Sequence, residues 1–261
     1  MFKFYFNEQI HEVSHKQVIN PKKEDYANHM HTYCEMILFL SGDVDYNIDG
    51  NIYKPKKDDL MFIPKDTYHC LMPKVDTVYE NYVLSFSADV FTSEEYKKIF
   101  SYPLVVNIKD DSLISDFFQK LDLYNELFST DDFKKSAFHL IYELLTYCCY
   151  LNKENSSDAS NNPIVDEIIS YISQNLKEPL NSEMIAEALN LSKSHVQNIF
   201  SEKMNVGLKQ YILKRKIFAA RNDIKSGKKP VEVSEDYGFD NYSNFYRAYK
   251  KIFGYSPKTK K

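Results

Sequence analysis

Two short helical patterns separated by a glycine occupy residues 230–257, and they constrain the fold of this chain more than any other segment. Their apolar residues recur every three or four positions, which predicts two amphipathic helices. Gly238 lies between the helices, where its freedom to adopt a positive φ suits a sharp turn. Asp240 is placed to cap the second helix, and Gly254 with Pro257 ends it. A helix, a tight turn and a second helix with a polar outer face are typical of a DNA-binding helix-turn-helix.

The same pattern occurs once before, so the carboxy-terminal region contains a repeat. Residues 185–192 correspond to residues 233–240, with Asn190 at the turn and Ser192 at the expected cap. Asparagine tolerates the left-handed conformation that the glycine of the second copy adopts freely. Between the copies, residues 208–225 predict a long helix that can fix the spacing of the two units.

Residues 1–100 contain short apolar or alternating segments separated by turns, which is the pattern of β-strands. The apolar segment 35–40 is followed by an alternating segment that ends at the Asp-Gly pair 49–50, a strong hairpin signal. Segments 60–63 and 79–86 predict further strands. Many short strands joined by tight turns predict a small β-sandwich or barrel.

The spacing of apolar residues changes to three or four between residues 110 and 153, which predicts two antiparallel helices separated near Ser129. This helical hairpin either only covers one side of the barrel or also serves a partner. Asn162 is expected to cap a further helix that begins with Pro163. The chain is thus expected to have three parts: a first domain over residues 1–153, a flexible linker over 154–162 and a helical domain over 163–261.

The composition indicates a folded protein with an uneven charge. Of the 261 residues 43% are hydrophobic, and they include 21 Tyr and 18 Phe, which argues against disorder. Residues 163–261 carry a net charge of +6, from 17 Lys and Arg against 11 Asp and Glu. Residues 1–162 carry −10, from 16 against 26. Only the basic part is therefore expected to meet a polyanion, the alternative being random variation of surface charge.

The cysteines and the apolar segments indicate in which cellular compartment the protein is expected. The four cysteines form no CxxC pair, so buried and reduced thiols are expected rather than a disulfide framework or a cysteine zinc site. The apolar amino terminus is too short for a signal peptide, and no later run is long enough to span a bilayer. The sequence therefore predicts a cytoplasmic protein with no membrane partner.

Three histidines and a glutamate stand out in the strand-rich part, namely His29, His31, Glu35 and His69. Their order and spacing resemble the two motifs of the cupin superfamily, and Gly42 stands where the first motif places a glycine. Imidazoles and a carboxylate on neighbouring strands are suitable ligands for a divalent metal. Alternatively they line a pocket without metal or satisfy one another by hydrogen bonds. A pocket without a metal or other cofactor is the interpretation preferred from the sequence.

Residues 163–261 resemble the DNA-binding domain of the AraC/XylS family, and residues 1–153 resemble its cupin-type regulatory domain. The matching residues of the second helix pair are Gly238, Phe239, Phe245, Arg247, Lys250, Gly254, Ser256 and Pro257. Those of the first pair and the long helix are Ala186, Ser192, Phe200, Tyr211, Arg215 and Ala220. One helix pair is a weak signal, whereas two at this spacing followed by Gly-x-Ser-Pro are a specific one. The chain departs from the family pattern at Asn198, where arginine is frequent.

The resemblance implies a two-domain α+β fold, in which a cupin-like β-barrel with a helical hairpin precedes an all-α domain of two helix-turn-helix motifs joined by a long helix. It implies a transcription regulator whose two recognition helices enter successive major-groove segments of double-stranded DNA. The residues expected to contact DNA are Lys193, Ser194, Gln197, Asn198, Asn241, Tyr242, Ser243, Tyr246 and Arg247. Arginine can bridge two acceptors of guanine, and glutamine or asparagine can pair with adenine.

A small-molecule effector, such as a sugar or another metabolite, is expected in the barrel. The residues expected to contact it are His29, His31, Glu35, Tyr46, Met61 and His69. A homodimer is expected as well, and RNA polymerase is a further expected partner. The alternative from another class is a metal-dependent cupin enzyme, an isomerase or dioxygenase, in which the three histidines and the glutamate hold the metal and the helical part is accessory. The preferred interpretation has no catalytic residue.

Overall fold

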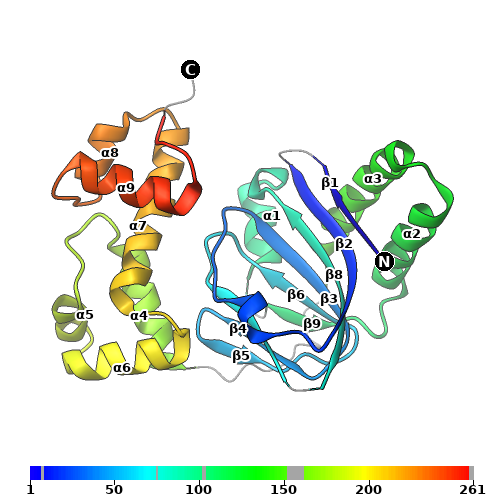
Figure 1. Cartoon of the computed structure of the whole chain (residues 1–261), viewed down its shortest axis with the longest axis horizontal. Coiled ribbons are helices and arrows are strands. Elements are labelled where there is room, and N and C mark those ends of the chain that lie inside the picture. The colour runs from blue at the N-terminus through cyan, green and yellow to red at the C-terminus, as the bar shows by residue number, and fades with distance from the viewer. Residues whose placement is uncertain (7–8, 75, 102–103, 152–161, 259–261) are drawn as a thin grey trace. The chain divides into compact units, whose positions relative to one another are not determined.

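The computed structural model describes residues 1–6, 9–74, 76–101, 104–151 and 162–258 (Figure 1). The chain divides into two compact units, Met1–Ser160 and Asn161–Lys261. The first unit contains the strands and several helices, and the described part of the second unit is helical. The predicted α+β class is therefore confirmed. The predicted linker 154–162 lies outside the described residues except for Asn162.

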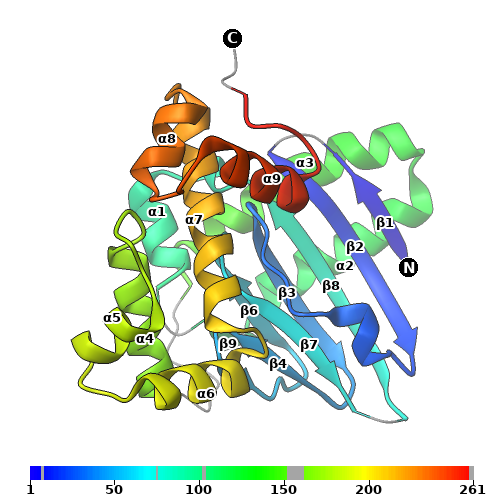
Figure 2. The ribbon, with the colours of Figure 1, turned by 60° about the vertical axis from the view of Figure 1, so that its left-hand side comes forward.

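The strands of the first unit form two antiparallel sheets (Figures 1 and 2). The larger sheet has the order β1-β2-β8-β3-β6-β9 and the smaller one the order β5-β4-β7. The strands are β1 (Phe2–Tyr5), β2 (Ile10–Ile19), β3 (Cys34–Ser41), β4 (Val44–Ile48), β5 (Asn51–Tyr53), β6 (Asp59–Ile63), β7 (His69–Pro73), β8 (Val78–Phe86) and β9 (Val105–Asn107). Side chains from both sheets, such as Ile37, Tyr46 and Leu71, share one apolar core.

Two tight turns connect successive strands of the first unit. Asp49 and Gly50 join β4 to β5 with φ angles of 47° and 85°, so the predicted Asp-Gly hairpin is confirmed. Gly42 joins the two sheets with a φ of 129°. A Cβ on Gly42 would lie 3.1 Å from the Cα of Tyr79, because the chain passes directly against β8.

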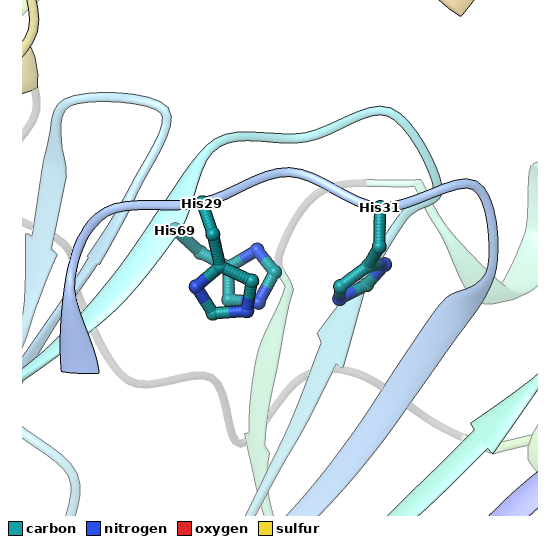
Figure 3. Close-up of side chains that lie close together, drawn as sticks. All are labelled: His29, His31 and His69. Carbon is teal, nitrogen blue, oxygen red and sulfur yellow. The ribbon is translucent and has the colours of Figure 1, made fainter. Parts of the chain in front are cut away.

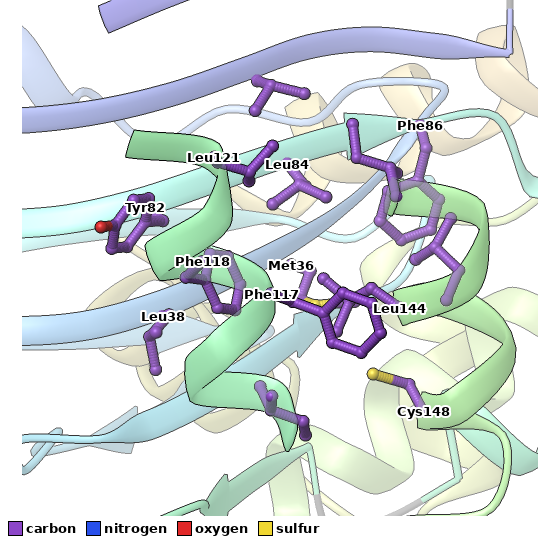
Figure 4. Packing of buried hydrophobic residues seen from close by; sticks show 14 of the residues in the cluster. Met36, Leu38, Tyr82, Leu84, Phe86, Phe117, Phe118, Leu121, Leu144 and Cys148 are labelled. Carbon is purple, nitrogen blue, oxygen red and sulfur yellow. The ribbon is translucent and has the colours of Figure 1, made fainter. Parts of the chain in front are cut away.

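Strand β3 is buried on both faces, which accounts for its continuous apolar sequence. Ile37 and Phe39 point into the core between the sheets, whereas Met36 and Leu38 point to the opposite face. The helical hairpin α2 (Ser112–Leu127) and α3 (Thr130–Cys148) covers that opposite face (Figure 4). Its contacts with the sheet come from Phe117, Phe118, Leu121, Leu144 and Cys148, which pack with Leu84 and Phe86 of β8.

The remaining elements of the first unit are short. Two 3₁₀ turns, η1 (Lys23–Tyr26) and η2 (Ala88–Val90), and the helix α1 (Ser93–Ile99) connect the strands. None of the four cysteines, all of which lie within the described residues, forms a disulfide, and three of them are buried, as expected from the sequence. Among the described residues, no helix is long and apolar enough to cross a membrane.

The second unit contains two helix pairs and a long helix between them. The helices are α4 (Pro163–Gln174), α5 (Ser182–Ala188), α6 (Lys193–Met204), α7 (Leu208–Lys225), α8 (Pro230–Asp236) and α9 (Tyr242–Phe253). Asn190 and Gly238 occupy the corresponding turns with φ angles of 53° and 69°, as the repeat predicts. The side chain of Asn162 caps α4 by accepting the Val165 N–H at 3.2 Å.

The cap of α9 is Asn241, so the prediction of Asp240 is wrong. The side-chain oxygen of Asn241 accepts the Asn244 N–H at 2.9 Å, whereas Asp240 is an exposed turn residue. In the first pair the cap is Ser192, two residues after the turn residue Asn190. The second pair has one extra residue before its cap, and this insertion displaces the cap by one position.

Replacing Asn241 with alanine is expected to lower the free energy of unfolding by about 1 kcal/mol, because the Asn244 N–H loses its acceptor. Asp240→Ala is the matched control, since it removes a neighbouring polar side chain without removing the cap. Urea-induced unfolding of both variants, followed by circular dichroism in the absence of DNA, measures the difference. A larger loss of stability in Asp240→Ala would contradict the capping assignment.

Candidate nucleic-acid interface and ligand pocket

A cavity of about 210 Å³ lies between the two sheets of the first unit. Strand β8 contributes four alternate residues to its wall, because successive side chains of a strand point to opposite faces. The lining residues are Glu12, Lys16, Val18, Tyr26, His29, Glu35, Ile37, Tyr46, His69, Leu71, Tyr79, Asn81, Val83 and Ser85. The wall thus combines an apolar surface with three tyrosines and several ionisable groups.

His29, His31 and His69 lie close together (Figure 3), and His29 and His69 line this cavity. Two backbone hydrogen bonds between His29 and His69, of 3.1 and 3.0 Å, hold the chain before β3 against β7. The imidazole ring of His69 lies 4.3 Å from that of His29 and 4.8 Å from that of His31 between ring centroids. Residues 29 and 69 are distant in the sequence, so the sheet pairing creates the cluster.

Backbone carbonyls orient all three imidazoles. The Nδ1 atoms of His29, His31 and His69 lie 3.1, 2.7 and 3.0 Å from the carbonyl oxygens of Ala27, Tyr33 and Thr67. A carbonyl oxygen can only accept, so each neutral ring carries its proton on Nδ1 and keeps a lone pair on Nε2. The Nε2 atoms of His31 and His69 are buried and have no aligned hydrogen-bond partner.

The carboxylate of Glu35 lies beside two of these rings. Its Oε2 is 3.4 Å from Nε2 of His31 and 3.3 Å from Nε2 of His69. Burial opposes ionisation of Glu35, but the adjacent imidazoles of His31 and His69, in their protonated form, outweigh burial and hold its pKa well below the usual range. Burial, with repulsion from His69, lowers the pKa of His29 to about 4, although part of this side chain stays exposed.

The donor set fits a divalent metal ion. The atoms that the three histidines can offer lie within 4.8 Å of one another, and Glu35 adds an oxygen ligand. Imidazoles whose Nδ1–H donates to a carbonyl are the usual form of metal-bound histidine, because this contact fixes the tautomer and the ring orientation. The same atoms can also accept hydrogen bonds from an organic ligand.

The structure places the predicted pocket residues in different surroundings. His29, Glu35, Tyr46 and His69 line the cavity, and His31 contacts Glu35. Met61, in contrast, is fully buried in the apolar core of the two sheets.

Sequence reasoning missed several polar residues of the wall, among them Tyr79 and Asn81 of β8. The hydroxyl groups of Tyr79 and Tyr46 form a hydrogen bond, and Asn81 has a buried side-chain oxygen without a hydrogen-bond partner. Both residues belong to the alternating series of residues 79, 81, 83 and 85 on β8. This period of two in the sequence was the signal that could have identified them.

Helix α6, the first predicted recognition helix, presents the four predicted residues on its exposed surface. Two of them already have partners on α5: Lys193 forms an ion pair with Glu183, and Gln197 donates to the hydroxyl of Ser182 at 3.2 Å. Ser194 and Asn198 are exposed. His195, which sequence reasoning missed, is also exposed in the first turn of α6.

Helix α9, the second predicted recognition helix, carries the other predicted residues except Asn241, which precedes it as the cap. Ser243 and Arg247 are exposed, and the Arg247 guanidinium donates to the side-chain oxygen of Asn244 at 2.7 Å. Tyr242 and Tyr246 are half-buried, with ring centroids 6.2 Å apart. Asn241 caps the helix, so its side chain has a structural role as well.

Comparison with known proteins gives two family matches. Residues 185–261 match the family described as a helix-turn-helix domain, and residues 15–73 match the family described as a cupin domain. The multiple antibiotic resistance protein MarA of Escherichia coli is 31% identical over 94 residues, which cover 36% of this chain and 74% of MarA. The HTH-type transcriptional regulator YdiP of Escherichia coli is 20% identical over 247 residues, which cover 91% of this chain and 81% of YdiP.

Among solved structures, ToxT of Vibrio cholerae matches with a TM-score of 0.39 and 14% identity over 94% of both chains. The family assignment rests on the sequence relatives and on the two matched families. The chain belongs to the AraC family of DNA-binding helix-turn-helix transcription regulators, with a cupin domain in its N-terminal part, and its family is one of regulators rather than enzymes.

Proposed function

We propose that this regulator reads two successive major-groove segments with α6 and α9, and that a ligand in the cavity of the cupin domain controls this binding. The observation that carries the proposal is the pairing of two exposed, polar recognition helices with one basic unit of net charge +6 over residues 163–261. A cationic surface attracts the phosphate backbone, and the polar side chains supply contacts to base edges.

The chemistry of the exposed side chains differs between the two helices. On α9, Arg247 can donate two hydrogen bonds to the O6 and N7 acceptors of guanine, which gives strong discrimination between bases. On α6, Asn198 stands at the matching position and can pair with adenine, while Lys193 must exchange Glu183 for a phosphate. We therefore infer that α9 contributes more to sequence recognition than α6.

The polar end of the cavity limits the chemistry of its ligand. Among the residues that line the cavity, Glu35 offers a carboxylate, and His69 Nε2 and the side-chain oxygen of Asn81 are buried acceptors without an aligned hydrogen-bond partner. A ligand that offers hydrogen-bond donors, such as a sugar with several hydroxyl groups, satisfies these acceptors, and the tyrosines can pack on its apolar face. Ligand binding changes DNA affinity to the extent that the ligand prefers one of two states of the protein.

A divalent metal ion is a second candidate for the ligand, because the three oriented imidazoles favour it. His29, His31, His69 and Glu35 would hold the ion, which would supply a positive charge for an anionic or hydroxylated effector. The metal-dependent enzyme considered from the sequence does not follow from this, since the chain belongs to a regulator family.

A homodimer through α2 is the third part of the proposal. Leu123 and Leu127 lie one turn apart near the end of α2 and form an exposed apolar stripe, with 48% and 67% of their surface exposed. Leu113, at the start of α2, is 53% exposed but is separated from them by the exposed Asp116 and Lys120. A second copy of the chain would remove this apolar stripe from water. RNA polymerase remains a predicted partner on the basis of the family alone.

Arg247→Ala is expected to lower the affinity for specific DNA by roughly 10- to 100-fold, because it removes a bidentate contact to a base. Asn198→Ala, the matched change on α6, is expected to have a smaller effect. DNA selected from a random duplex pool with the wild-type protein provides the probe, and fluorescence anisotropy measures binding. Equal losses for the two variants would mean that both helices contribute equally, and failure to select any sequence would contradict specific recognition.

Metal-stripped protein is expected to bind one zinc ion per chain, and His69→Ala is expected to weaken this binding by at least about 100-fold. His139→Ala is the matched control, because His139 is an exposed histidine of α3. Isothermal titration with zinc chloride measures affinity, and the selected duplex then measures the effect of zinc on DNA binding. Equal zinc affinity in the wild type and in His69→Ala would exclude this site and leave the organic ligand.

Leu123→Glu combined with Leu127→Glu is expected to raise the dissociation constant of the dimer by at least about tenfold, since each change places a charge where apolar surface would be buried. Thr146→Glu introduces a charge at an exposed position of α3, away from α2, and serves as the control. Sedimentation velocity measures the masses. A wild-type protein that stays monomeric at all concentrations would disprove the dimer.

A further inference from the structure

Lys216 is a buried lysine in the middle of α7. Its residue surface is only 7% exposed, and its Nζ donates to the carbonyl oxygens of Glu178 at 2.8 Å and Tyr237 at 2.9 Å. Burial lowers the pKa of Lys216, so the fold places an ammonium group where its hydration is poor. Such a group persists in a structure when the surrounding acceptors replace the lost water.

The two carbonyl groups belong to different parts of the DNA-binding unit. Glu178 lies between α4 and α5, at the entry to the first helix pair. Tyr237 is the C-cap residue of α8, at the turn inside the second pair. Because carbonyls at the end of a helix are partly negative, the Tyr237 oxygen is a good acceptor for an ammonium group. One side chain of α7 therefore connects both helix pairs.

Residues 176–178, which lie between α4 and α5, make further contacts with the second helix pair. Leu176 packs against the apolar core that α7, α8 and α9 share. Lys177 places its Nζ 3.6 Å from Asp223 and 3.9 Å from Asp236. These ion pairs are largely exposed and contribute little by themselves. The hydrogen bonds to Lys216 are the buried part of this connection.

The turns that join α7 to the two helix pairs do not by themselves fix the distance between these pairs. Gly227, with a φ of 105°, lies in the turn between α7 and α8, and Gly207 precedes α7. Glycine gives both joints conformational freedom. Contacts that span these joints therefore add to the apolar core shared by α7, α8 and α9 in keeping the helix pairs in one arrangement.

We propose that Lys216 is a positioning residue that holds the two helix pairs at one separation and rotation, and thereby sets the spacing of the DNA segments that the protein accepts. The DNA part of this inference rests on the proposed function, in which both α6 and α9 read DNA. Adjacent major-groove segments on one face of B-DNA are one helical turn apart, about 34–36 Å. Each inserted base pair changes both the distance and the rotation between them.

The first test measures the spacing of the helix pairs without DNA. Spin labels on Ser201→Cys of α6 and Lys251→Cys of α9, with Cys149→Ser to remove the half-exposed thiol, report the distance by pulsed electron resonance. A narrow distribution is expected in this labelled protein and in its Lys216→Arg form, because arginine also donates to several carbonyl oxygens. Lys216→Met, which has no donor, is expected to broaden the distribution. Equal widths in all three would overturn the proposal.

The second test uses the DNA duplex selected with the wild-type protein and the same duplex with one base pair inserted between the two protected segments. The insertion is expected to weaken wild-type binding by roughly 10- to 100-fold, the cost of a mismatched base pair. Lys216→Met is expected to reduce this penalty to a few-fold, whereas Lys216→Arg and the control Lys214→Met keep it.

The ratio of the two affinities separates positioning from simple loss of stability. A merely destabilised protein binds both duplexes less well and keeps the wild-type ratio, and that outcome in Lys216→Met would overturn the positioning role. Circular dichroism checks the fold of each variant, and Lys216→Gln, whose amide can still donate to one carbonyl, replaces Lys216→Met if the latter does not fold. Protection of a single DNA segment by the wild type would refute the two-segment proposal, while the label distances would still test Lys216.

Discussion

The cupin domain depends on the burial of β3 on both faces. One face packs with the helices α2 and α3, and the other packs with the smaller sheet, so the strand has apolar residues at nearly every position. Glu35 is the exception, and it faces the cavity with Ile37. A carboxylate on such a strand must have partners, because burial of an isolated charge is costly. The Ser85 hydroxyl donates to the Glu35 carboxylate at 3.2 Å and the imidazoles of His31 and His69 lie beside it, so the same constraint that forms the core also creates the polar end of the cavity.

The sequence predicted most of what depends on local patterns. The Asp49-Gly50 hairpin, the helical hairpin and the cap of α4 all follow from residues that are close together in the chain. The cluster of three histidines was predicted from motif spacing, although the backbone carbonyls that orient the rings were not, because these contacts depend on the exact path of each loop. The wall contributed by β8 was missed, since its alternation was interpreted only as a strand.

The capping prediction for α9 was wrong, and the predicted pocket residue Met61 is not among those that line the cavity. Both differences have a simple physical origin. Asp240 and Asn241 are both good capping residues, and only the length of the turn decides between them. Met61 belongs to a strand whose five residues are all buried, so a period of two cannot tell which side chains face the cavity and which fill the core.

Buried polar groups that lack hydrogen-bond partners indicate something different from buried polar groups that have them. Beside the cavity, the Nε2 atoms of His31 and His69 lie near the Glu35 carboxylate without an aligned hydrogen bond, and the side-chain oxygen of Asn81 is buried without a hydrogen-bond partner. Lys216 is buried to a similar degree, but two carbonyl oxygens satisfy its ammonium group. Since an unsatisfied buried polar group costs stability, its retention needs a reason outside the isolated fold, and binding of a donor or cation supplies one. The ammonium group of Lys216 already has two acceptors within the fold and needs no ligand. Its proposed role is therefore to maintain the arrangement of the two helix pairs.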